Sequence, residues 1–396
     1  MHQSHYQNRS KLTSRQVRKI TVDTLMEHFN LRIEGHKFKT EDIWNVVVAA
    51  ATQGQAIESA ANQLEGAPAP STVRLYLRNE LEVTPLEALE ADCNEALVSQ
   101  LPPRIRGTSH KIAIDLTFIP YHGQAAQDPD EICRSQAKSG TTHFHGYATA
   151  YVIKKNKRVT LALSYVQAKE TLPQVLERLL ARLKALDVSC KRLYLDKQFC
   201  CVRVIRYFQT QHPRMQVVIP VIIRGKQGGT RALLQGKQSY RTSYTMCSRQ
   251  HGKATFEIGV VRKYSKGRYG HHGVKWFAYV LLGPIGSPLS QIYQDYRQRF
   301  GIESTYRLMN KVRARTSSRS PGLRLLYVGI ALCLVNLWVY LKWAYLGWPR
   351  RGGRQVCAQL FPLTMFKQFL LEAFKDIYQP VRSVALPQIY PDRLQL

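Results

Sequence analysis

The sequence predicts a mixed α/β fold, in which helices flank a mixed sheet and a β-rich insertion interrupts the second half. Three changes of pattern along the 396 residues support this prediction. Residues 1–105 show the helical spacing of apolar side chains, whereas residues 106–223 alternate strand-like runs with helical segments. Residues 224–283 combine glycine-rich turns with strand-forming runs, and residues 284–396 return to helical spacing.

The first region is predicted to be a helical DNA-binding domain with the outline of a helix-turn-helix near residues 55–80. QAIESAANQL is followed by the turn EGAP and by a second helix that starts near Pro70. Two short helices of an ordinary bundle have the same outline, so a scaffold role stays open. The second helix carries four outward groups that could enter a major groove: Thr72, Arg74, Tyr76 and Arg78.

The second region begins with KIAIDLTFIP, a strand-like run with apolar residues on both faces. GYATAYVI and RVTLALSYV follow, joined by the basic turn KKNKR, and predict a hairpin. After it, LPQVLERLLARLKAL and VRVIRYFQTQ have helical spacing, and RLYLD and MQVVIPVII are predicted strands. Near the start of the last region, SQIYQDYRQRFGIESTYRLMNKV is predicted to form one long helix.

The charge of the chain points to a polyanionic partner. Lys and Arg number 57 against 27 acidic residues, which gives a formal net charge of +30. An excess of that size favours nucleic acid, because no basic amphipathic helix or lipidation motif indicates a membrane surface. The eight cysteines include no CxxC pair and the N-terminus has no apolar signal segment, so a cytoplasmic, nucleoid-associated protein is expected.

Residues 325–341 form an almost wholly apolar run that is interrupted by Asn336. Its length is at the lower limit for crossing a bilayer. A single marginal span is more typical of a helix buried in a large core, and we therefore predict a core helix and no membrane partner. A membrane-associated protein anchored through this run is the rival interpretation.

Three acidic residues lie at positions where a carboxylate is unusual unless it is paired, protonated or bound to a metal ion. Asp115 lies inside a run that should be buried on both sides, and Asp196 ends the strand RLYLD, where ligand sites gather in α/β sheets. Glu303 lies on a helix face with Tyr296 and Arg299, at helical spacings. Three hard oxygen ligands from separate elements suit Mg²⁺ or Mn²⁺. The alternative is three structural acids, with Asp196 a helix cap and Glu303 a surface ion pair.

The segment YRQRFGIESTYR places Tyr296, Arg299 and Glu303 in the spacing Y-x2-R-x3-E. This pattern resembles the signature around the catalytic glutamate of insertion-sequence transposases of the DDE class, especially the IS-four superfamily and its ISH-three group. IDLTFIPYHG and YLDKQF are similar to that group's two aspartate motifs. The resemblance extends over roughly residues 110–345.

The resemblance implies a ribonuclease-H-like catalytic domain, whose first part is residues 106–223 and whose C-terminal helical part is residues 284–396. It implies catalytic carboxylates that bind two Mg²⁺ or Mn²⁺ ions for cleavage of DNA and transfer of its 3′ ends. It also implies a homodimer on double-stranded DNA, the element ends and the target. The implied metal ligands are Asp115, Asp196 and Glu303.

The resemblance further implies phosphate contacts by Tyr296 and Arg299. The superfamily has a Lys seven residues after the glutamate, where this chain has Asn310. Arg307, about 40° round the helix from Glu303, is preferred as the replacement over Lys311 at about 80°. A second departure is Gln198, which follows the second aspartate where a small residue is usual, and makes the turn less permissive.

Other basic and aromatic groups are predicted to contact DNA. The turns KKNKR, RGKQGG and YSKGRYGHHG can follow phosphates, and Tyr264 and Tyr269 can stack on exposed bases or be buried in the insertion. His143 and His145 alternate on a strand, but soft ligands at zinc spacing are absent from the sequence, so zinc is not expected. A catalytically inactive DNA-binding protein or repressor derived from a transposase remains the alternative function.

Overall fold

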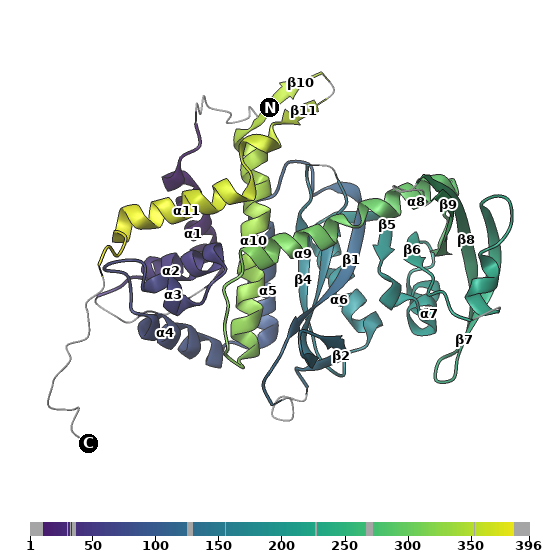
Figure 1. Cartoon of the computed structure of the whole chain (residues 1–396), viewed down its shortest axis with the longest axis horizontal. Helices are drawn as coiled ribbons and strands as arrows, with labels where there is room; N and C mark the ends of the chain where they lie inside the picture. The colour runs from purple at the N-terminus through teal and green to yellow at the C-terminus, as the bar shows by residue number, and fades with distance from the viewer. Residues whose placement is uncertain are drawn as a thin grey trace.

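The computed structural model describes residues 11–29, 31, 33, 37–124, 130–154, 156–225, 228–266, 272–351 and 353–383 (Figure 1). Its helices are α1 (Ser14–His28), α2 (Thr40–Gln53), α3 (Ile57–Ala61), α4 (Pro70–Val83), α5 (Leu86–Ser99), α6 (Leu172–Ala185), α7 (Val202–Gln211), α8 (Leu289–Gln298), α9 (Gly301–Lys311), α10 (Pro321–Tyr345) and α11 (Leu363–Tyr378). Its strands are β1 (Thr108–Pro120), β2 (Cys133–Lys138), β3 (Thr141–Val152), β4 (Thr160–Val166), β5 (Val188–Leu195), β6 (Val217–Pro220), β7 (Tyr240–Ser248), β8 (Gly252–Lys266), β9 (His272–Leu282), β10 (Gly347–Arg350) and β11 (Gly353–Val356).

One mixed sheet runs through the middle of the molecule, with the strand order β2-β3-β1-β5-β6-β9-β8-β7 and with β4 also paired to β3. Strands β1, β3 and β4 are antiparallel neighbours, and β5 and β6 then continue parallel to β1. The helices α6 and α7 make the connections that parallel strands require. Three antiparallel strands followed by two parallel strands form a ribonuclease-H-like core, which confirms the predicted fold class.

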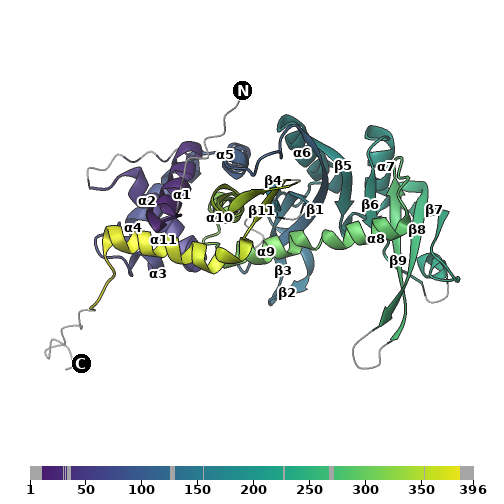
Figure 2. The ribbon, with the colours of Figure 1, turned by 90° about the horizontal axis from the view of Figure 1, so that it is seen from above.

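The β-rich insertion continues this sheet. Strand β9 pairs antiparallel with β6, β8 pairs with β9, and β7 forms the outer edge beyond β8. Figure 2 shows these strands at the end of the molecule farthest from the N-terminal helices. The sequence also missed β2, a short strand that pairs with the start of β3 and has mostly polar side chains.

The two ends of the chain share one helical core. Helix α10 packs on α5 and α4, and α11 lies across α1 and α2. In Figure 1, α10 stands between the N-terminal helices and the sheet. The apolar run 325–341 lies in α10, and 83% of the most apolar 18-residue stretch of this helix is buried inside the protein. Asn336 explains the polar interruption, because its side-chain amide bonds Thr160 in β4 and Leu97 in α5.

The prediction of a single helix over residues 290–312 is wrong. Two helices, α8 and α9, meet at Arg299 and Phe300, where the backbone bonds tighten: Arg299 N donates to Tyr296 O at 3.0 Å, and Ile302 N donates to Arg299 O at 2.8 Å. Gly301, a weak helix former, follows at once. The break turns the Arg299 side chain inward, which decides the geometry of the candidate site.

Candidate active site

The strand register brings the two aspartates together. Ile114 of β1 is the partner of Leu195 in the parallel strand β5, so Asp115 and Asp196 follow at neighbouring positions. Asp196 begins a short 3-10 turn, Lys197–Phe199, which the chain adopts with Gln198 in place, and buried Phe199 anchors this turn. The side chain of Asp196 makes no capping hydrogen bond, so the structure does not support its reading as a helix cap.

Glu303 approaches the same place from the first turn of α9. All three carboxylates contact the guanidinium of Arg299, which is only 3% exposed. Its Nη1 lies 3.1 Å from Asp115 Oδ2, and its Nη2 lies 2.9 Å from Asp196 Oδ1 and 3.5 Å from Glu303 Oε1. Residues from β1, from the end of β5 and from α9 therefore converge, and Glu303 is not part of a simple surface pair.

Two tyrosines hold the helices to the strands that carry the aspartates. The hydroxyl of Tyr306 donates to the backbone carbonyl of Asp115 at 3.0 Å and is 2.7 Å from the hydroxyl of Thr149 in β3. The hydroxyl of Tyr296 donates to the carbonyl of Leu195 at 3.3 Å. Tyr296 is predicted to contact a DNA phosphate, but in the structure its hydroxyl already forms a hydrogen bond inside the protein. Tyr306 was not among the predicted site residues, although it lies three residues after Glu303.

A buried carboxylate on α8 supports the site from behind. Asp295 is 1% exposed and accepts from Lys111 of β1 at 2.7 Å. Its other oxygen lies 3.6 Å from Arg192 Nη1 and accepts from the hydroxyl of Tyr194 at 3.1 Å. Gln291, one turn earlier on α8, donates from its side-chain amide to Oδ1 of Asp295. Asp295 therefore fixes α8 against β1 and β5, one turn before Arg299, and it was not among the predicted site residues.

The electrostatics of the cluster follow from burial. The pKa of Asp115 is raised to about 6, mainly because burial disfavours its charged form, with Arg299 opposing the shift and Asp196 adding to it. The pKa of Arg299 is raised: burial acts to lower it, and the nearby Tyr296, Asp115 and Asp196 more than offset burial. Burial also raises the pKa of Tyr296 and of Tyr306.

The donor atoms fit a hard divalent cation, but their present spacing does not. Carboxylate oxygens from three elements are the ligands that Mg²⁺ and Mn²⁺ prefer. Within the described residues, however, no three His, Cys, Asp or Glu side chains lie close enough to share one ion. The guanidinium of Arg299 lies among the three carboxylates instead.

The remaining predicted DNA-binding residues lie on two surfaces. Arg307 and Lys311 are exposed on α9 and form no ion pair within the part of the chain that the structure describes. Arg74 and Arg78 are exposed on α4, and Thr72 is half-buried there. Arg74 pairs with Glu58, and Arg78 lies 3.6 Å from Glu82.

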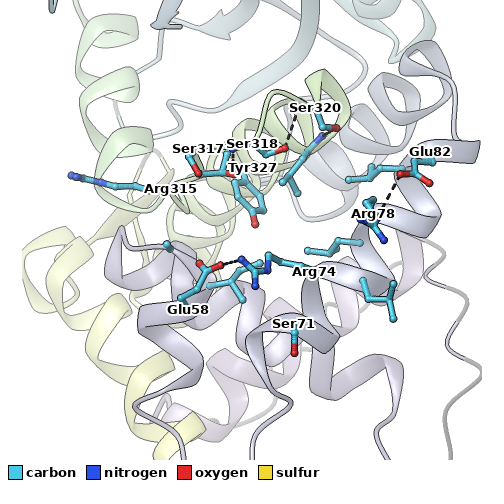
Figure 3. Close-up of a pocket in the computed structure, with 17 residues that line it drawn as sticks. Glu58, Ser71, Arg74, Arg78, Glu82, Arg315, Ser317, Ser318, Ser320 and Tyr327 are labelled. Atoms are coloured by element: carbon cyan, nitrogen blue, oxygen red, sulfur yellow. Dashed lines mark hydrogen bonds and ion pairs between the residues drawn. The ribbon is translucent and has the colours of Figure 1, made fainter. Parts of the chain in front are cut away.

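Both α4 arginines line a groove of about 880 Å³ between α4 and the start of α10 (Figure 3). Its far wall is a basic, hydroxyl-rich segment that includes Arg315, Ser317 and Ser320. This segment runs directly from α9, the helix of Glu303, into α10. The groove therefore joins the predicted DNA-binding helix to the segment that follows the candidate site.

A second groove, of about 750 Å³, lies between the β8–β9 hairpin and α8. Aromatic rings and cations line it, and none of its lining residues is acidic. Tyr264 and Phe300 are 63% and 51% exposed, so rings are accessible there; Tyr269 lies outside the described residues. Phe300 and Tyr296 flank Arg299 in the chain, which puts this aromatic groove beside the carboxylates. Its other exposed or half-buried rings and cations are Trp276, Phe277, Tyr293, Lys263, Lys275 and Arg297.

His145 serves the core. It is completely buried, neither ring nitrogen has a hydrogen-bond partner among the described residues, and its ring packs edge-on to Tyr121 at 5.3 Å. Burial, reinforced by Arg324, lowers the pKa of His145 to about 3. A histidine in an unfolded chain has a pKa of about 6.5. Below that pH the unfolded chain therefore binds a proton at this position, whereas the folded chain keeps His145 neutral.

We expect the stability contributed by neutral His145 to be lost as the pH falls from about 6.5 toward about 3. His145→Phe keeps a ring in the core and removes this proton uptake. The urea midpoint of the variant should therefore fall less than that of the wild type between about pH 7 and about pH 5. His122→Phe, at an exposed position, is the control and should behave as wild type. If the urea midpoint fell equally with pH in all three proteins, the prediction would be contradicted.

Comparison with known proteins gives a structural match only. No protein-family model matches the chain, and no curated protein matches its sequence. A cryo-electron microscopy structure of the piggyBac transposase synaptic complex with hairpin DNA contains a similar chain, with a TM-score of 0.54 at 11% identity. The two chains share a fold. The match covers 93% of this chain and 81% of that chain, so the likeness includes both the helical half and the extended sheet.

Proposed function

We propose that this chain is a DDE transposase, which binds the inverted ends of its own element, cuts phosphodiester bonds and joins the 3′ ends to target DNA. The observation that carries the proposal is the convergence of Asp115, Asp196 and Glu303 on one buried point. They come from the first strand, from the end of the first parallel strand and from the helix after the insertion of a ribonuclease-H-like sheet. The shared fold with the piggyBac transposase and the Y-x2-R-x3-E resemblance to the IS-four superfamily support it.

The chain's own residues have separate tasks in this proposal. The three carboxylates are the proposed ligands of two Mg²⁺ or Mn²⁺ ions, which when bound supply charge stabilisation at the reacting phosphate. Tyr306 and Tyr296 hold the backbone of both aspartate strands in place. Arg307 and Lys311, exposed on the Glu303 helix, are placed to hold phosphates of the strand that is cut.

The DNA-binding surface in this proposal comprises both grooves. The net charge of +30 favours the phosphate backbone, and the α4 groove offers arginine and hydroxyl donors to it. The aromatic groove offers rings and cations beside the carboxylates, which suits unstacked bases near the cut. Transposition requires two ends to be held together, so we propose a homodimer on DNA.

Phe300→Ala should weaken binding of a single-stranded oligonucleotide by about 5- to 150-fold, because stacking on an aromatic ring contributes about 1–3 kcal/mol per base. Fluorescence anisotropy on the full chain measures this directly. Trp348→Ala is a matched control, since Trp348 is an exposed aromatic residue in β10, away from both grooves. An equal loss in both variants, or none in Phe300→Ala, would argue against base stacking in the aromatic groove.

The enzyme is tested with a duplex that carries the inverted repeats flanking its gene. Wild-type protein should nick this duplex in Mg²⁺ and leave it intact in EDTA. A duplex of the same length with scrambled ends should not be cut. Binding without cleavage under all metal conditions would instead identify a transposase-derived DNA-binding protein or repressor.

A further inference from the structure

The candidate site already contains a cation, and that cation belongs to the chain. Arg299 contacts all three carboxylates through its two terminal nitrogens, at 3.1, 2.9 and 3.5 Å. Its Nε is buried and has no hydrogen-bond partner within the described residues. The side chain is thus directed at the acidic cluster.

The cluster needs a positive charge in order to persist. Like-charged carboxylates that share a buried place disfavour one another's charged forms, and a neighbouring cation relieves the repulsion. Asp115 is 12% exposed and Asp196 is 22% exposed in their side chains, so water screens them poorly. One guanidinium against three carboxylates still leaves excess negative charge, which keeps the place attractive to a divalent ion.

A guanidinium and a metal ion cannot occupy this place together. The Arg299 fork bonds Asp115 with one nitrogen and Asp196 with the other, and so lies between the two carboxylates. For these oxygens to share one ion, the guanidinium must leave. The oxygens that accept from Arg299, Oδ2 of Asp115 and Oδ1 of Asp196, are of the hard carboxylate type that such an ion prefers.

Two aromatic rings lie beside Arg299 on the side of the aromatic groove, where its guanidinium could move. Its guanidinium lies 5.4 Å from the ring of Tyr296 and 6.0 Å from the ring of Phe300, and both residues line the aromatic groove. Arg299 stands at the break between α8 and α9, where the helix is already interrupted. A rotation of this side chain would therefore move the guanidinium along two rings toward the groove, where a DNA phosphate can accept it.

We propose that Arg299 is an internal counter-ion that keeps the carboxylates together and gives up its place when a divalent ion binds. It is a positioning residue, and the proposal rests on the metal-dependent function proposed above. It reverses the expected effect of a mutation: removing a merely structural arginine would weaken metal binding, whereas removing a competitor strengthens it.

The test is Mn²⁺ binding by the full chain without DNA, measured by calorimetry on wild type and Arg299→Gln. Arg299→Gln should bind Mn²⁺ at least about tenfold more tightly, and its melting temperature should be lower in EDTA and recover with Mn²⁺. Arg299→Lys keeps the charge and should stay near wild type. Arg203→Gln, at an exposed position on α7, is the control and should equal wild type. Arg299→Gln combined with Asp196→Asn should lose the added affinity.

A second measurement uses the wild-type protein, in case Arg299→Gln does not fold. Phenylglyoxal modifies accessible arginines, and peptide mass spectrometry reports each site. Arg299 should be protected in EDTA and become reactive in saturating Mn²⁺, while Arg307 reacts equally in both. Continued protection of Arg299 in Mn²⁺ would overturn the proposal. Equal Mn²⁺ affinity in wild type and Arg299→Gln would overturn the counter-ion proposal and leave the proposed function standing. No Mn²⁺ binding by either protein would overturn both the counter-ion proposal and the metal-dependent function.

Discussion

Under the proposed function, Asp196→Asn is expected to reduce cleavage of the element ends by about 10³-fold, because losing one of the proposed metal ligands would remove roughly 4 kcal/mol of transition-state stabilisation, at roughly 1.4 kcal/mol for each tenfold in rate. Asn keeps the size of the side chain and one oxygen that can accept from Arg299. Asp196 also follows β5 and precedes a short turn, so the strand pairing does not depend on its charge. The measurement is single-turnover nicking of the duplex with inverted repeats.

The companion measurements separate chemistry from binding and folding. A gel-shift titration with the same duplex should give an affinity for Asp196→Asn close to that of wild type, since the phosphate contacts are proposed to lie elsewhere. Asp130→Asn is the matched control: among the described residues its exposed carboxylate pairs with Lys169 alone, and the variant should cut at the wild-type rate. Full activity of Asp196→Asn would remove Asp196 from the catalytic set.

The fold and the approximate position of the site could be predicted because both depend on local patterns. Alternation of strand and helix periodicity predicted a mixed sheet with helices on its faces, and a charge inside an apolar run singled out Asp115. Asp196 was found in the same way, at the end of a short strand. The parallel register then brings both residues together, and register follows once strands with buried faces pair.

The details of the site could not be predicted, because they depend on contacts between distant positions. Arg299 is 184 residues from Asp115 and 103 from Asp196, and its inward turn breaks a segment whose local sequence has continuous helical spacing. Tyr296 and Tyr306 have the same helical spacing as any amphipathic stripe. Only the packed structure shows that their hydroxyls bond to strand carbonyls instead of facing solvent or DNA.

The largest stability effect is expected from Asp295→Ala, at about 3–5 kcal/mol, because truncating the carboxylate of a buried charge network leaves the buried Arg192 without its ionic partner. Arg192 is 5% exposed, and would face an empty space where the carboxylate was. The hydroxyl of Tyr194 would lose its acceptor and Lys111 its 2.7 Å ion pair. These groups belong to β1 and β5, so the loss weakens the attachment of α8 to the two strands that carry Asp115 and Asp196.

Urea unfolding of the full chain, followed by tryptophan fluorescence, measures the effect. Asp295→Asn retains an acceptor for Tyr194 and should be less destabilising than Asp295→Ala. Asp23→Ala is the control for loss of an ordinary pair, because Asp23 and Lys19 are mostly exposed on α1, and its effect should stay below about 0.5 kcal/mol. If Asp295→Ala cost no more than Asp23→Ala, water or other residues would have satisfied Arg192 and Lys111. The position of α8, and with it that of Arg299, would then have to depend on the apolar contacts of this helix alone.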